Sequence, residues 1–256
     1  MTLFLLPVMG FFIGMIIIAL GGGGGGFYVG VLTALFNVAP ATAASTSLAT
    51  IIPTTTVGMI AHWKAGNVNF KLGSVMMVSA VIGAVIGSMF SDYVPDEYYN
   101  KITGILLLAL SVQMFFGYLK QKKQQVGVET VKKYIFIDWA KAFFYGILGG
   151  ALSGLVGISG TAPIVAGLII LGCKPLEIVG TSVFVLIGIS TTGFLMHLGL
   201  GNVDWELVGL LILGTTSGAF LAPIVLSKFD KQKTEKVLIP IIVTMTFVMS
   251  WMVILK

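Results

Sequence analysis

The second half of this chain repeats the first half, without a gap, at an offset of 135 residues. Between residues 46 and 84, twelve of thirty-nine positions are identical to those 135 residues further on, whereas a shared apolar composition alone gives roughly 10%. The matches include polar residues and glycines: Thr46, Ser47, Thr56, Gly58, His62, Gly66, Asn67 and Val68 match Thr181, Ser182, Thr191, Gly193, His197, Gly201, Asn202 and Val203. A self-match at a fixed spacing indicates an internal duplication, so we expect two copies of one folding unit.

Each copy is made of apolar segments. The chain is 57% hydrophobic and 10% charged, far from the balance of soluble proteins. Apolar runs cover 3–20, 27–38, 43–61, 69–90, 102–119, 142–157, 161–172, 177–197, 205–226 and 237–255. A helix needs roughly 20 residues to cross a hydrocarbon core, so 27–38 and 161–172 are too short and 3–20 and 142–157 are marginal. The pattern predicts an all-α, multi-pass membrane protein.

Glycine-rich breaks precede the two short runs, at 21–26 and 154–160. Glycine ends helices and permits sharp reversals. We therefore expect each half to contain a broken, short helical hairpin followed by three long transmembrane helices. The first repeat would cover 1–119 and the second 142–256, joined by a linker at 120–141 that includes an interfacial helix at 131–141 with aromatic and lysine anchors. Residues 1–20 lack a basic segment and a cleavage site and are expected to be mature structure.

Lysines predict how the two halves are oriented. The linker and the loop 227–236 are rich in lysine, which places both on the cytoplasmic side, whereas the loop 91–101 would lie outside. Each half then crosses the membrane an odd number of times, so the copies are expected to be inverted relative to each other. Inverted repeats are typical of secondary transporters, whose binding sites lie near the midplane where discontinuous helices meet.

The candidate substrate site combines the glycine breaks with a duplicated Thr-Ser pair. Backbone amide groups at a helix N-terminus attract anions, and irregular backbone survives at membrane depth only inside protein or along a wet cavity. The expected substrate-binding residues are Gly24, Gly25, Thr46, Ser47, Ser159, Gly160, Thr161, Thr181 and Ser182. The alternative is structural: the glycines would permit close helix packing, and the hydroxyl groups would bond to carbonyl groups one turn earlier.

The remaining polar residues narrow the function. His62 and His197 are candidates for proton sensing or gating, or else they only meet carbonyl groups at helix ends, where Asn67 and Asn202 are expected to cap or turn the chain. We expect no Asp or Glu inside a spanning run, which favours anionic or neutral cargo. We expect no metal site, no cofactor, no ATP hydrolysis and no nucleic-acid binding. The single cysteine, Cys173, is expected to be an inert, space-filling thiol.

With this layout the chain resembles the TauE/SafE sulfite exporter family, also called the four-toluene sulfonate uptake permeases. The glycine clusters GGGGGGFYVG at 21–30 and GLVGISGTAPIV at 154–165 carry the resemblance, together with ASTS at 44–47 and VGTS at 179–182. The resemblance covers nearly the whole chain. It implies transport, usually export, of sulfite, sulfoacetate or other organosulfonates across a prokaryotic cytoplasmic membrane.

Three hypotheses follow for the function. The first is an anion exporter that works by alternating access, with the lipid bilayer and a small organosulfur anion as its partners. The second is a transporter or channel for another small solute, such as a carboxylate or a metal ion. The third, a membrane enzyme or scaffold, is disfavoured because the sequence lacks a catalytic constellation and extramembrane domains. The exact substrate, the coupling ion, the direction of transport and the presence of a homo-oligomer stay open.

Overall fold

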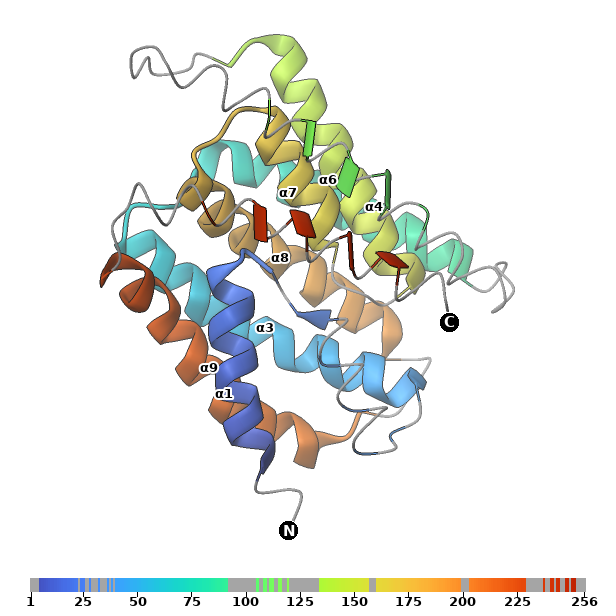
Figure 1. Cartoon of the computed structure of the whole chain (residues 1–256). Coiled ribbons are helices and arrows are strands. Elements are labelled where there is room, and N and C mark those ends of the chain that lie inside the picture. The colour runs from blue at the N-terminus through green and yellow to red at the C-terminus, as the bar shows by residue number, and fades with distance from the viewer. Residues whose placement is uncertain are drawn as a thin grey trace.

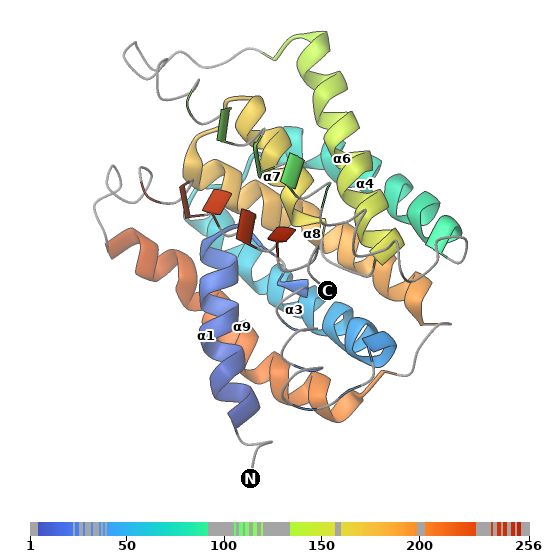
Figure 2. The ribbon, with the colours of Figure 1, turned by 45° about the vertical axis from the view of Figure 1, so that its right-hand side comes forward.

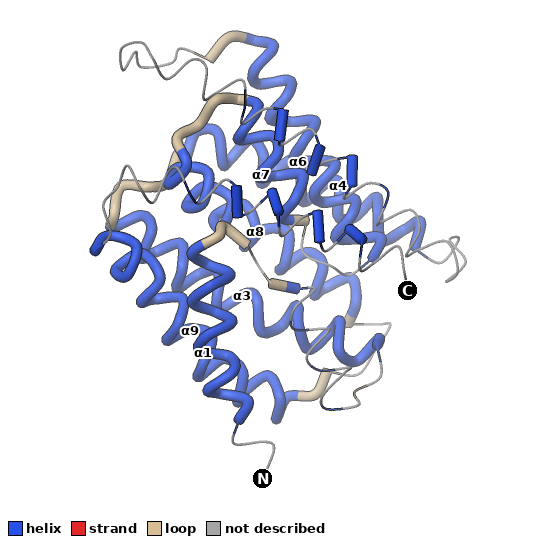
Figure 3. The backbone as a smooth tube through the Cα atoms, viewed as in Figure 1, coloured by secondary structure: helices blue, strands red, loops and turns tan. Residues whose placement is uncertain are grey.

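The regular secondary structure in the described part of the chain is all α-helix, as expected, and loops join the helices (Figures 1 and 3). The computed structural model describes residues 5–22, 24–25, 28, 32, 36, 38, 40–91, 105, 108–109, 111–112, 115–116, 119, 134–156, 160–198, 203–228, 237, 240–241, 243–244, 247–248 and 250–251. Its helices are α1 (Leu5–Ala19), α3 (Pro40–Lys64), α4 (Phe70–Ser91), α6 (Phe136–Val156), α7 (Thr161–Ile170), α8 (Pro175–His197) and α9 (Trp205–Lys228). The lysine-rich stretch 120–133, the loop 229–236 and most of the runs 27–38, 102–119 and 237–255 lie outside the described residues.

Three of these helices are long and apolar enough to cross a membrane. They are Phe70–Phe90, Pro175–Met196 and Trp205–Lys228, whereas α1 and α7 are shorter apolar helices. The ten residues of α7 agree with the expectation that 161–172 is too short for a comfortable crossing. The structure therefore combines helices of membrane-spanning length with shorter apolar helices.

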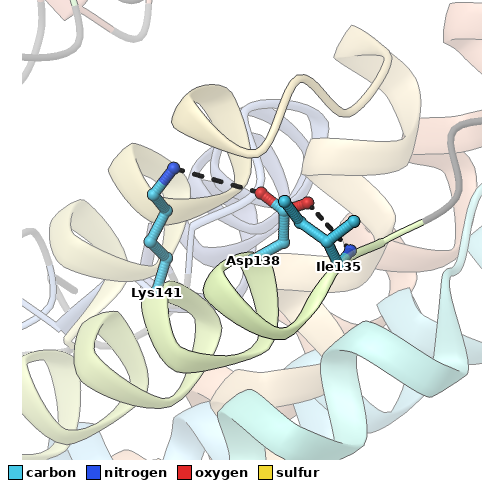
Figure 4. Close-up of polar contacts among 3 residues, drawn as sticks. All are labelled: Ile135, Asp138 and Lys141. Atoms are coloured by element: carbon cyan, nitrogen blue, oxygen red, sulfur yellow. Dashed lines mark hydrogen bonds and ion pairs between the residues drawn. The ribbon is translucent and has the colours of Figure 1, made fainter.

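The linker boundary expected at residue 141 falls inside α6. This helix runs without interruption from Phe136 to Val156, so the end of the expected interfacial segment and the first apolar run of the second half form one helix. The Asp138 carboxylate accepts a hydrogen bond from the Ile135 N–H at 3.2 Å, which satisfies a backbone donor at the helix start. The same carboxylate lies 4.0 Å from the Lys141 ammonium (Figure 4).

The halves exchange contacts in a regular way. In the first half, α4 packs on α6 of the second half; in the second half, α9 packs on α1 of the first (Figures 1 and 2). The pairs α3 with α9 and α4 with α8 are related in the same manner, and α3 packs on α8. An offset of 135 residues converts each of these pairs into its counterpart, so the duplication seen in the sequence extends to the tertiary contacts.

Glycines permit the closest helix contacts. A Cβ atom at Gly150 of α6 would overlap the Ala80 carbonyl of α4, and one at Gly214 of α9 would overlap the Pro7 carbonyl of α1. In a membrane, helices associate through such close backbone contact because lipid provides no hydrophobic driving force between them. The glycines of α1, α4, α6 and α9 thus set the distance between the two halves.

Substitution of Gly150 by Ala should destabilise the fold. The added methyl group has no room beside the Ala80 carbonyl, and such overpacking costs about 1–3 kcal/mol. We expect a lower unfolding temperature of the purified protein in detergent, measured by intrinsic fluorescence.

Gly209→Ala is the matched control because a Cβ atom there meets no atom within 4 Å. That variant should unfold at the wild-type temperature or slightly above it, since Ala favours helix more than Gly does. Equal unfolding temperatures for the two variants would contradict the packing role of Gly150.

Candidate functional site

The first glycine break lies directly after α1. Gly21 and Gly24 have positive φ angles of 75° and 76°, a conformation that residues with a Cβ atom rarely adopt. The chain becomes helical again at Gly25, and the Tyr28 N–H donates to the Gly24 carbonyl at 3.0 Å. The interruption that the glycine tract predicts is therefore present in the structure.

Both duplicated serines bond to this break. The Ser182 hydroxyl of α8 donates to the Gly21 carbonyl at 2.7 Å, and also lies 2.9 Å from the Val179 carbonyl. The Ser47 hydroxyl of α3 donates to the Gly25 carbonyl at 3.3 Å. Both serines are fully buried, so one glycine tract receives a hydroxyl group from each half of the chain.

The two threonines connect the halves instead. The Asp204 N–H donates to the Thr46 hydroxyl at 3.1 Å, and the Asn69 N–H donates to the Thr181 hydroxyl at 2.9 Å. Thr46 and Thr181 are equivalent repeat positions, and so are Asn69 and Asp204. The start of α3 therefore meets the chain after α8, and the start of α8 meets the chain after α3, which makes α3 and α8 antiparallel.

The residues of the second break have other neighbours. Gly160 packs against Gly149 of α6, and α7 begins at Thr161, the first residue of the expected short run. Ser159 lies outside the described residues. Among the expected site residues, the structure brings together Gly24, Gly25, Ser47 and Ser182 around the first break.

His62 lies at the end of α3 and is fully buried. Its Nε2 atom is 3.3 Å from the Ile18 carbonyl of α1, and its Nδ1 atom is 3.5 Å from the Asn67 amide nitrogen. A neutral ring with its proton on Nε2 satisfies both contacts, because Nδ1 then accepts from the Asn67 amide. The side chain of His197 lies outside the described residues.

The helix caps lie two residues beyond the expected asparagine. The Asn69 side chain accepts from the Leu72 N–H at 3.1 Å, and the Asp204 side chain accepts from the Leu207 N–H, also at 3.1 Å. These are N-terminal caps of α4 and α9, whereas Asn67 contacts His62. A search for identical residues in the two copies does not find these caps, because the cap is Asn69 in one copy and Asp204 in the other.

The expectation that spanning runs contain no carboxylate is wrong. Glu177 and Glu206 lie in the first turns of α8 and α9, where the helix dipole favours negative charge. Glu177 Oε1 accepts from the Asn69 amide at 2.7 Å, and its Oε2 accepts from the Lys174 N–H at 3.3 Å. The argument for anionic cargo must therefore come from other features.

A second group of buried hydroxyl groups escaped the search for duplicated residues. Thr54 of α3 and Thr215 of α9 lie with their Oγ1 atoms 2.7 Å apart. The hydroxyl of Tyr28, one turn after Gly24, is adjacent to both. All three residues are fully buried. Their signal in the sequence is polar character that occurs in one copy only.

Comparison with known proteins agrees with this layout of broken and spanning helices. The family model described as "Sulfite exporter TauE/SafE" matches residues 6–249. The chain belongs to the TauE/SafE family. It is 31% identical over 214 residues to the probable membrane transporter protein YdhB of Bacillus subtilis (strain 168), covering 82% of this chain and 85% of YdhB. It is 27% identical over 242 residues to the probable membrane transporter protein YunE of the same organism, covering 86% of this chain and 87% of YunE. No solved structure gives a significant match.

In this TauE/SafE protein, the threonine contacts between the halves should contribute to stability. Thr46→Val and Thr181→Val each remove the acceptor of a backbone N–H from the other half. An unsatisfied donor of this kind costs about 1–3 kcal/mol when buried. We expect both variants to unfold at lower temperature than the wild type in detergent.

Thr191→Val provides the control, because in the part of the chain that the structure describes the Thr191 hydroxyl bonds only within its own helix, to the Ile187 carbonyl at 2.8 Å. Its unfolding temperature should stay close to that of the wild type. If Thr46→Val and Thr181→Val were as stable as Thr191→Val, these two hydrogen bonds between the halves would contribute nothing measurable to stability.

Proposed function

We propose that this TauE/SafE protein is a secondary transporter that exports small sulfur-containing anions across the cytoplasmic membrane by alternating access. Sulfite, sulfoacetate and other organosulfonates are the expected cargo. The observation that carries the proposal is the glycine break after α1, which receives Ser47 from one half and Ser182 from the other. A discontinuous helix met by both halves is the arrangement in which secondary transporters bind substrate.

An inverted repeat is part of this proposal. The antiparallel pairing of α3 and α8, and the exchange of contacts between the halves, support a two-fold axis in the membrane plane. Charge supports it as well, because Lys71 and Glu206 occupy equivalent, exposed positions with opposite sign. Basic residues are enriched on the cytoplasmic side, so the start of α4 would face the cytoplasm and the start of α9 would face outward.

Anionic cargo suits the chemistry of the break. Sulfonate oxygens accept hydrogen bonds from hydroxyl and amide groups, and the glycines leave the amide groups without covering side chains. Export of a monovalent anion from a negative interior gains about 2.3 kcal/mol per 100 mV, so even a uniporter could drive efflux.

Another small anion or a metal ion is the alternative cargo. A metal ion would need several close ligands, and the described residues hold no group of three or more His, Cys, Asp or Glu. Glu177 nevertheless places a carboxylate in the first turn of α8. Measurement of flux into or out of proteoliposomes separates these possibilities when carboxylates and divalent cations are tested beside the sulfonates.

The inverted arrangement predicts opposite labelling of equivalent positions. Trp63 and Leu198 are related by the offset of 135 residues and are 57% and 46% exposed. Each would be replaced by Cys in a Cys173→Ser background and treated with a membrane-impermeant maleimide in intact cells and in inverted vesicles. Trp63→Cys should react only in inverted vesicles and Leu198→Cys only in intact cells.

The Cys173→Ser protein without an added cysteine measures background labelling. Reaction of both cysteines from the same side would exclude inverted repeats. Such a result would leave the family assignment untouched, because that assignment depends on the sequence match.

The transport proposal predicts sulfonate efflux from proteoliposomes under an inside-negative potential. Ser182→Ala and Ser47→Ala should both lower the rate, Ser182→Ala by about fivefold or more, because the loss of a hydrogen bond to the break costs about 1 kcal/mol or more. The effect of Ser47→Ala should be smaller, since its bond is 3.3 Å long against 2.7 Å for Ser182.

Ser217→Ala serves as the control because the exposed Ser217 hydroxyl has the Leu213 carbonyl of its own helix as its only hydrogen-bond partner within the described ranges. It should transport at the wild-type rate. The absence of flux for every sulfur oxyanion and organosulfonate tested, from protein shown to be folded, would refute the proposed cargo.

A further inference from the structure

The hydroxyl groups of Tyr28, Thr54 and Thr215 meet in the protein interior, where three separate elements come together. Tyr28 follows the glycine break, Thr54 lies on α3 seven residues after Ser47, and Thr215 lies on α9. Thr215 lies at a close contact of α1 and α9, since a Cβ atom at Gly14 would overlap its backbone. We refer to Tyr28, Thr54 and Thr215 as the hydroxyl cluster.

The hydrogen bonds of the cluster leave one donor unused. A threonine hydroxyl has a single proton. The Thr54 hydroxyl lies 2.8 Å from the Thr50 carbonyl and 2.7 Å from the Thr215 hydroxyl. Both contacts are satisfied when Thr54 donates to Thr50 and accepts from Thr215. The Tyr28 hydroxyl lies close to both threonine hydroxyls, but it forms no well-aligned hydrogen bond with any residue in the described part of the chain.

An unpaired buried hydroxyl is unfavourable, and it calls for a reason. Packing does not supply one. The positions equivalent to Tyr28, Thr54 and Thr215 in the other copy are Pro163, Ile189 and Ala80, all of them apolar and buried. At these three positions the other copy builds the same framework from apolar side chains, so packing does not require a hydroxyl group at any of them. The three hydroxyl groups of the first arrangement therefore point to a ligand.

We propose that the hydroxyl cluster is an uncharged subsite that binds an oxygen atom of a monoanionic headgroup, such as that of an organosulfonate. This inference rests on the transport function proposed above and adds the charge of the cargo. The Tyr28 hydroxyl donates its free proton to the ligand, and Thr215 adds a second hydrogen bond when it turns away from Thr54.

The absence of positive charge sets the preference for a monoanion. The buried side chains among the described residues include no lysine and no arginine. Transfer of an ion out of water has a cost that rises steeply with its charge, and neutral donors offset that cost for a monoanion better than for a dianion. A sulfonate should therefore bind more tightly than sulfate.

Binding measurements on the purified full-length protein test the subsite. Ethanesulfonate, propionate and sulfate are titrated calorimetrically against wild type, Tyr28→Phe, Thr215→Val and Thr215→Ser. Tyr28→Phe should raise the Kd for ethanesulfonate by about tenfold or more, the usual effect of losing a hydrogen bond to a charged group. Its unfolding temperature without ligand should stay unchanged or rise, because the unpaired hydroxyl is gone.

The threonine variants separate binding from packing. Thr215→Val should weaken ethanesulfonate binding by about tenfold, whereas Thr215→Ser keeps the hydroxyl and should bind within about twofold of the wild type. Thr216→Val is the matched control, since among the described residues the neighbouring Thr216 hydroxyl bonds only to the Ile212 carbonyl of its own helix. It should bind as the wild type does.

The outcomes distinguish this inference from the transport proposal. Wild-type sulfonate binding that Tyr28→Phe and Thr215→Val leave unchanged would refute the subsite and leave the transport proposal intact. Sulfate bound as tightly as ethanesulfonate would refute the preference for a monoanion. Binding of propionate but of no sulfonate would refute the proposed cargo, and loss of propionate affinity in Tyr28→Phe would then still support the subsite. A lack of binding by all three probes would refute the subsite.

Discussion

A break in a helix inside a membrane exposes backbone groups that no water can satisfy, and the structure depends on how this chain meets that constraint after α1. The Gly21 and Gly25 carbonyl groups accept hydrogen bonds from Ser182 and Ser47. One serine comes from each half, so the irregular backbone is stabilised only when the halves are assembled around it. The break, which would be costly in lipid, is thereby placed where the helices of both copies meet.

The same duplication supplies two similar connections at opposite ends of the antiparallel α3 and α8. At one end Thr181 accepts from the Asn69 N–H, and at the other Thr46 accepts from the Asp204 N–H, with lengths of 2.9 and 3.1 Å. Under the alternating-access mechanism proposed above, opening toward one side would break one connection and keep the other. Because the two bonds are of the same chemical kind, the inward-open and outward-open states would differ little in energy from this source, as alternating access requires. The Asn69 amide also bonds to Glu177, whereas the equivalent positions at the other end hold Asp204 and Thr42.

Sequence reasoning recovered the features that depend on periodicity and on glycine. The helical fold, the short helix at α7 and the break at Gly21–Gly24 all follow from hydropathy and backbone chemistry, and the structure confirms them. The roles of individual side chains depend on which elements meet in space, and this is why they were harder to predict. Thr46 and Ser47 are neighbours in the chain, yet Thr46 bonds to the backbone of the other half and Ser47 bonds to a carbonyl of the glycine break. Glu177 was overlooked because an apolar average over a long run hides one carboxylate at a helix start.

Differences between the two copies carry information that their similarities do not. Positions kept in both halves, such as Thr46 and Thr181, have equivalent structural contacts, which is what a shared framework requires. A substrate that binds once per chain has no need of two equal sites, so the chemistry of binding can diverge at positions the framework leaves free. Tyr28 faces Thr54 and Thr215, whereas its counterpart Pro163 lies in a copy where those positions are Ile189 and Ala80. The copies can therefore retain a common architecture while only one of them places a tyrosine hydroxyl beside two threonine hydroxyls at these positions.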